Sequence, residues 1–151
     1  MVSKIENFKI PFIGWNMRLN DYIELKRGDK GSIMAILRSC RETLAKGSSI
    51  MMFPEGTRSP DGRLRRFKPG AFELAKDSGR PLLPVVVDGT ATALPKKGLI
   101  LQGRHRIEIR VLDAIPYESF ADQSVEDLTL RVRELIAGHL EREKEGPPPV
   151  D

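Results

Sequence analysis

Short apolar runs alternate along this sequence with stretches patterned like amphipathic helices, and this alternation is the strongest constraint on its fold. Residues 49–53 and 82–87 are continuous apolar runs, typical of buried strands. Residues 21–26 and 105–112 instead alternate apolar and polar side chains, as half-buried strands do. Helical patterns separate most of these runs. The order predicts an α/β fold in which helices cover a mostly parallel central sheet.

Three longer helices are expected. The first opens at residues 31–32 and ends at Gly47, a residue that suits a helix C-terminus. The second starts at Pro69 and runs to about Ser78. The third starts near Ser124, with acidic residues in its first turn. The side chains expected on the buried faces of the first and third helices are Ile33, Ile36, Leu37, Cys40, Leu44, Val125, Leu128, Val132, Leu135, Ile136 and His139.

The length of 151 residues suits one domain. No linker interrupts residues 1–145, so these are expected to form that domain, with the proline-rich residues 146–151 as a disordered tail. No apolar run is long enough to span a bilayer. Cys40 is the single cysteine, which excludes a disulfide within the chain.

Positive charge is concentrated in one predicted loop. The whole chain has 25 Lys and Arg against 21 Asp and Glu, a net charge of +4. Residues 58–68 alone hold five basic side chains and one acidic side chain, which also gives +4. The loop precedes a helix, and helix N-termini favour anions. These residues predict a phosphate site, while an ordinary solvated basic turn is the alternative.

The residues just before and within this loop have distinct expected roles. Arg58 offers a planar fork to phosphate oxygens, and Thr57 adds a neutral hydroxyl donor. Gly56 allows a positive φ or a close backbone approach. Glu55 is an acceptor, so it is expected to orient Arg58 or to accept from a substrate hydroxyl.

Residues 53–59, Phe-Pro-Glu-Gly-Thr-Arg-Ser, resemble the third sequence motif of the glycerolipid acyltransferases, in particular the 1-acyl-sn-glycerol-3-phosphate acyltransferase family. Residues 67–71 are similar to the basic segment that follows that motif, and residues 83–90 to the fourth motif. The resemblance extends from about residue 4 to about residue 112. The residues spaced like the second motif are Lys4, Pro11, Gly14 and Arg27.

This resemblance implies transfer of an acyl group from a thioester, on coenzyme A or acyl carrier protein, to a hydroxyl of lysophosphatidic acid during phospholipid biosynthesis. These thioesters are co-substrates, and neither a cofactor nor a metal is implied. Pro84 would support the acyl-donor side. The residues implied in substrate binding are Arg27, Glu55, Gly56, Thr57, Arg58 and Lys68.

The first motif of the family, a histidine followed five positions later by an aspartate, does not occur in this sequence. Arg110 follows His105 at that spacing, and Lys144 follows His139. Since a general base contributes about 10²–10⁴ in rate, the chain alone is expected to have little or no activity. The two explanations are an amino-terminal truncation, which is favoured, and a degenerate relative.

The segment Ile5–Met17 is the most apolar part of the chain and has basic flanks. Phe12 and Trp15 are expected to contact a membrane surface; the alternative is that they pack in the core or line an acyl channel. The resemblance implies peripheral attachment at the cytoplasmic face of a membrane. The alternative functions are a non-catalytic phosphate- or lysolipid-binding fragment and an acyltransferase for another lysolipid. Nucleic acid is not an expected partner, because stacking aromatic platforms are missing from the sequence.

Overall fold

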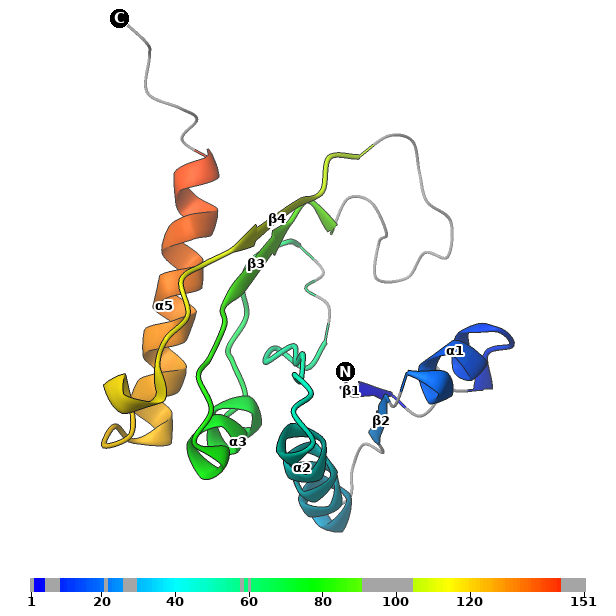
Figure 1. Cartoon of the computed structure of the whole chain (residues 1–151). Helices are drawn as coiled ribbons and strands as arrows, with labels where there is room; N and C mark the ends of the chain where they lie inside the picture. The colour runs from blue at the N-terminus through cyan, green and yellow to red at the C-terminus, as the bar shows by residue number, and fades with distance from the viewer. Residues whose placement is uncertain are drawn as a thin grey trace, which may run out of the picture. The chain divides into compact units, whose positions relative to one another are not determined.

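The chain folds into two compact units, Met1–Phe53 and Pro54–Asp151, each of which is described by itself. Figure 1 shows the computed structural model of the chain. The residues that it describes are 2–4, 9–20, 22–25, 30–57, 59, 61–90 and 105–144.

The first unit contains a pair of parallel strands and two helices. Strand β1 (Val2–Lys4) pairs with β2 (Ile23–Leu25) in parallel, and helix α1 (Ile13–Leu19) lies between them in the sequence. Helix α2 (Lys30–Ala45) follows β2. The strand expected at residues 21–26 is therefore confirmed, in a shorter form.

The apolar face expected of α2 is confirmed by burial. Ile36, Leu37 and Cys40 are buried, and Leu44 is half-buried. The helix ends at Ala45, and Gly47, expected at its C-terminus, follows two residues later with a φ of +84°, in the left-handed region that glycine adopts without strain.

The second unit begins with the loop that follows Phe53 and leads into helix α3 (Gly70–Ser78). Pro69 precedes this helix with φ −69°, close to the helical value that its ring imposes. Gly79 ends it with φ +61° in the left-handed conformation. Both ends agree with the sequence-based expectation.

Beyond α3 come two strands and the long C-terminal helix. Strand β3 (Val85–Asp88) pairs with β4 (Glu108–Val111), and a short 3-10 helix, η2 (Tyr117–Ser119), leads to α5 (Val125–Lys144). The Ser124 hydroxyl accepts a hydrogen bond from the Asp127 N–H at 3.0 Å. This cap explains why α5 begins where the sequence predicted.

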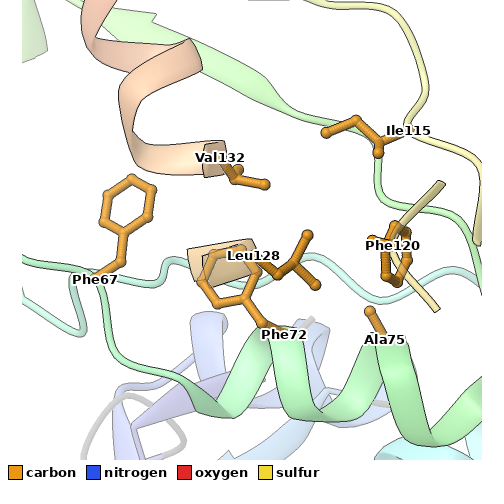
Figure 2. Packing of buried hydrophobic residues seen from close by; sticks show 7 residues of the cluster. All are labelled: Phe67, Phe72, Ala75, Ile115, Phe120, Leu128 and Val132. Carbon is orange, nitrogen blue, oxygen red and sulfur yellow. The ribbon is translucent and has the colours of Figure 1, made fainter. Parts of the chain in front are cut away.

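The core of the second unit lies between α3, η2 and α5 (Figure 2). Leu128 of α5 and Phe120 are completely buried at its centre. Phe67 anchors the loop that precedes α3, and its ring stacks on Phe72 at a centroid distance of 6.2 Å. The remaining buried members of the cluster are Ala75, Ile115 and Val132.

The α/β class is confirmed, and the described strands form two separate pairs, of which one is parallel and the other antiparallel. Strands β1 and β2 are parallel, whereas β3 and β4 run antiparallel from Val85 opposite Val111 to Asp88 opposite Glu108. A parallel neighbour requires a crossover of a dozen or more residues, usually a helix. An antiparallel return needs no such crossover.

The expected buried strand at residues 49–53 is wrong. Residues 48–53 have no regular secondary structure, and the side chains of Met51 and Phe53 are 50% and 60% exposed. A continuous apolar run favours a strand only where neighbouring strands and helices cover it. Within the described part of the chain, no strand pairs with this run.

The described helices include none that is both long and apolar enough to cross a membrane. Residues 146–151, expected to be a disordered tail, lie outside the described residues.

Candidate functional site

The basic loop, defined here as Pro54–Lys68, is closed by a backbone hydrogen bond where its two ends meet. This place, formed by residues 54–56 and Lys68, is called the neck of the loop. The Lys68 N–H donates to the carbonyl oxygen of Pro54 at 2.8 Å. The two ends of the loop are therefore neighbours, as in an Ω-loop, and Phe67 fixes this neck to the hydrophobic core. The loop projects from a rigid base.

Three of the residues predicted from the sequence meet at this neck. Gly56 has φ +67°, and a Cβ added there would lie 3.1 Å from both Cε and Nζ of Lys68. The Lys68 ammonium therefore lies directly over the Gly56 backbone. Glu55 precedes Gly56 and accepts a hydrogen bond through Oε2 from the Arg65 N–H at 3.2 Å. The neck thus combines an ammonium, a carboxylate and a half-buried glycine.

The tip of the loop is shaped by Asp61. Its Oδ1 accepts hydrogen bonds from the Ser59 hydroxyl at 2.8 Å and from the Arg63 N–H at 3.2 Å. The hydrogen bond from Ser59 is the main cause that lowers the pKa of the Asp61 carboxyl, followed by the bond from Arg63. Gly62 completes the turn with φ +74°.

We expect Ser59→Ala to move the pKa of Asp61 back towards 3.8, its ordinary value. A lowered carboxyl pKa contributes stability that is present above the ordinary value and is lost as the pH falls through the folded-state pKa. The turn should therefore loosen at a higher pH in Ser59→Ala than in the unmodified chain. An NMR titration of the Asp61 carboxyl carbon measures this pKa in both proteins. An unchanged pKa in Ser59→Ala would contradict the assigned cause.

The far side of the loop is fixed by an arginine that the sequence reasoning missed. Arg133, from α5, donates from Nε to the Arg65 carbonyl at 3.1 Å and from NH2 to the Leu64 carbonyl at 3.3 Å. No local sequence signal marks Arg133, because its partners are backbone atoms almost seventy residues away. Arg133 binds only the backbone of this segment. The side chains of the three arginines in the segment are exposed; they are Arg63, Arg65 and Arg66.

The other predicted site residues are distributed differently. Thr57 is half-buried in the loop, beside Gly56 in the sequence. Pro84 is buried at the start of β3, where its carbonyl accepts a hydrogen bond from the Leu112 N–H at 3.0 Å. Arg58 and Arg27, the two arginines expected to hold phosphate, lie outside the described residues.

The histidines and the cysteine lie in or beside other elements: α5, the segment before β4, and α2. His139 is half-buried in α5, with Nδ1 2.8 Å from the Leu135 carbonyl oxygen of the same helix. His105 is exposed just before β4. Cys40 is buried in α2, and burial raises the pKa of its thiol. Among the residues described, no three His, Cys, Asp or Glu side chains gather into a potential metal site.

Residues 1–88 match the protein family described as Acyltransferase. This chain belongs to the acyltransferase family. The resemblance inferred from the loop sequence is thereby confirmed, and the matched region includes the neck residues and Pro84.

Two curated relatives, both 1-acyl-sn-glycerol-3-phosphate acyltransferases, illustrate what this chain is similar to. The 1-acyl-sn-glycerol-3-phosphate acyltransferase of Chlamydomonas reinhardtii is 39% identical over 124 residues, covering 81% of this chain and 37% of that protein. The chloroplastic enzyme LPAT1 of Arabidopsis thaliana is 43% identical over 110 residues, covering 72% and 31% respectively. The chain thus spans about a third of the length of these relatives.

The fold of this chain is similar to that of an acyltransferase whose crystal structure is known. The crystal structure of the 1-acyl-sn-glycerophosphate (LPA) acyltransferase PlsC from Thermotoga maritima superposes with a TM-score of 0.82 at 30% sequence identity. The match covers 98% of this chain and 58% of that structure. It therefore includes α5 and Arg133, which lie beyond the region matched by the family.

Proposed function

We propose that this chain serves in acyl transfer from an acyl-CoA or acyl carrier protein thioester to lysophosphatidic acid, in phospholipid biosynthesis. Its membership of the acyltransferase family and the names of its relatives support the reaction. The observation that carries the substrate assignment is the neck of the basic loop, where the Lys68 ammonium lies over Gly56. The phosphate of lysophosphatidic acid is the anionic group that suits such a neck.

The residues of the neck suit a phosphate monoester better than a zwitterionic headgroup. Lys68 offers a compact positive charge with several donors, and the absence of a side chain at Gly56 lets this ammonium approach the backbone closely. Arg58 and Arg27 are proposed to bind the phosphate as the family resemblance implies, and Thr57 is proposed to add a hydroxyl donor. Glu55, held by the Arg65 N–H, is proposed to accept from a substrate hydroxyl. Pro84 is proposed to support the acyl-donor side.

The proton of the attacking hydroxyl requires a general base, and neither histidine of the chain is followed by an aspartate at the family's spacing. We therefore expect the purified chain to bind lysophosphatidic acid and to release little or no free coenzyme A from acyl-CoA. Sustained release of coenzyme A by the chain would contradict this expectation, whereas binding without turnover supports it.

We expect Lys68→Ala to weaken binding of lysophosphatidic acid by about 10–100-fold, because a hydrogen bond between charged groups contributes about 1.5–3 kcal/mol. Isothermal titration calorimetry with the full chain measures the affinity. Lysophosphatidylcholine, which lacks a phosphate monoester, should bind more weakly than lysophosphatidic acid to the unmodified chain.

Lys46→Ala is the matched control, since Lys46 is an exposed lysine in the turn after α2 and is not part of the basic loop. Its affinity should equal that of the unmodified chain. Equal affinities for Lys46→Ala and Lys68→Ala would remove Lys68 from the proposed phosphate site.

We further propose that the chain attaches peripherally to a membrane, on the cytoplasmic face, which water-soluble acyl donors can reach. Helix α1 and the residue before it support this placement, because Phe12, Trp15 and Leu19 are 76%, 61% and 84% exposed. The rings of Phe12 and Trp15 contact edge to face at 5.4 Å. Lys9 and Arg18 supply exposed positive charges nearby, as anionic lipid surfaces favour.

Replacing Phe12 and Trp15 together with alanine should abolish most flotation of the chain with vesicles that contain anionic lipid. The expected loss is at least about tenfold, because the two rings bury large apolar areas at the interface. Leu130→Ala, which removes an equally exposed apolar side chain from α5, is the control. Unchanged flotation of the double variant would assign these rings to packing instead.

A further inference from the structure

One peptide group of the basic loop is held from both of its sides. The Arg65 N–H donates to Glu55 Oε2 at 3.2 Å, and the carbonyl of the same peptide group, that of Leu64, accepts from Arg133 NH2 at 3.3 Å. The peptide is trans, so its N–H and its C=O point in opposite directions. Glu55 and Arg133 therefore bind opposite edges of a single rigid plane.

Arginine suits this position better than lysine does. The guanidinium of Arg133 uses two of its donors on two successive carbonyls, those of Leu64 and Arg65. A planar fork fixes both the distance and the orientation of the backbone that it binds, whereas an ammonium acts as a point charge. Arg133 thus controls the tilt of the Leu64–Arg65 peptide as well as its distance from α5.

Arg133 extends from a part of α5 that is packed into the hydrophobic core. Its neighbour in sequence, Val132, belongs to the same buried cluster as Phe67, two residues after Arg65 (Figure 2). Leu64 is partly buried against that cluster as well. A displacement of the Arg133 fork would therefore move the 64–65 peptide relative to a fixed frame, and the Glu55 carboxylate bonded to its N–H would follow.

We propose that Arg133 is a positioning residue for the substrate-binding loop: it sets the Leu64–Arg65 peptide, and this peptide sets the Glu55 carboxylate. The inference rests on the proposed function only in treating the loop as a substrate site. The coupling from Arg133 to Glu55 is a property of the protein itself and can be measured without a ligand.

The coupling test uses the full chain and the variants Arg133→Ala, Arg133→Lys and Arg131→Ala. Arg131 is the matched control, because it lies on the same helix and donates to the carbonyl of Ser119 at 3.2 Å, away from the loop. NMR measures the water-exchange rate of the Arg65 amide. We expect Arg133→Ala to raise it about fivefold or more, and Arg131→Ala to leave it unchanged. An unchanged rate in Arg133→Ala would overturn the proposal.

A thermodynamic cycle with Glu55→Ala supplies a second, ligand-free readout. If Glu55 and Arg133 act through one peptide group, the losses in free energy of unfolding for Glu55→Ala and Arg133→Ala should be non-additive in the double variant. Additive losses would mean that the two contacts are independent, and the proposed coupling would fail.

Binding of lysophosphatidic acid separates positioning from simple charge. Arg133→Ala should bind about tenfold more weakly than the unmodified chain, and Arg133→Lys, which keeps the charge, should recover only part of the loss. Full recovery in Arg133→Lys would assign Arg133 a purely electrostatic role and overturn positioning. Failure of the unmodified chain to bind would refute the proposed function, while the exchange rates and the cycle would still decide the coupling.

Discussion

Leu128→Ala is expected to lower the free energy of unfolding of the Pro54–Asp151 unit by about 2–5 kcal/mol. Leu128 has no exposed surface and lies at the centre of the cluster that joins α5 to α3. Removing three carbon atoms there loses their transfer free energy and leaves a cavity that its aromatic neighbours fill only in part. Urea denaturation followed by circular dichroism measures the change. Because Phe67 belongs to the same cluster, its packing contacts, which hold the basic loop on the core, should be lost in the same unfolding transition.

Leu130→Ala is the control for this experiment. Leu130 lies two positions later on α5, with its side chain 57% exposed, so the same chemical change should alter the free energy of unfolding by less than about 0.5 kcal/mol. Equal losses for the two variants would show that the cluster around Leu128 is not the core of this unit.

Gly89→Ala is expected to produce the second large effect, a loss of about 2–4 kcal/mol in the free energy of unfolding. Gly89 has φ +78°, and an added Cβ would lie 2.1 Å from the Arg106 carbonyl oxygen. Neither group is a flexible side chain, so the backbone beyond β3 or before β4 must shift. The N–H of Gly89 also donates to the Asp88 carboxylate at 2.7 Å, a bond that such a shift would disturb.

Gly79→Ala separates strain from steric overlap. Gly79 has φ +61°, yet an added Cβ there would meet nothing within 4 Å. Its substitution should therefore cost only the left-handed strain of about 1–2 kcal/mol. Thermal denaturation compares the two variants, and an equal loss at both positions would contradict a close approach of the backbone at Gly89.

Helices were predictable from the sequence because their signals are local. Pro69 and Gly79 delimit α3, and the spacing of apolar residues along α5 places Leu128 and Val132 on its buried face. Each of these signals acts within one or two turns of the chain. They need no knowledge of distant partners, so the expected boundaries agree with the structure to within a residue or two.

Strand pairing was less predictable, because it depends on partners far along the sequence. The three-residue strand β1 carries no pattern of its own and exists only by pairing with β2. The antiparallel pairing of β3 with β4 likewise joins residues at least twenty positions apart in the sequence, from Val85 opposite Val111 to Asp88 opposite Glu108. The run at residues 49–53 shows the converse: no strand among the described residues pairs with it, and Met51 and Phe53 are exposed.

In the candidate site too, residues close together in the sequence were predictable and a distant one was not. Glu55, Gly56 and Lys68 were recognisable because the motif places them in one short loop, and the structure brings them together at the neck. Arg133 reaches that loop from α5 through backbone carbonyls. Carbonyl acceptors are present at every residue, so no pattern of side chains in the sequence can indicate such a contact.

The hydrogen bond between Lys68 N–H and the Pro54 carbonyl has a consequence for how the loop can diversify. Because the ends of the loop meet in their own backbone, residues at the tip can be exchanged or inserted without stretching the core beneath. Doubling the length of a flexible loop costs only about 0.6 kcal/mol in closure entropy. The tip around Asp61 should therefore tolerate substitutions and insertions while the contact between Lys68 and Gly56 at the neck stays intact.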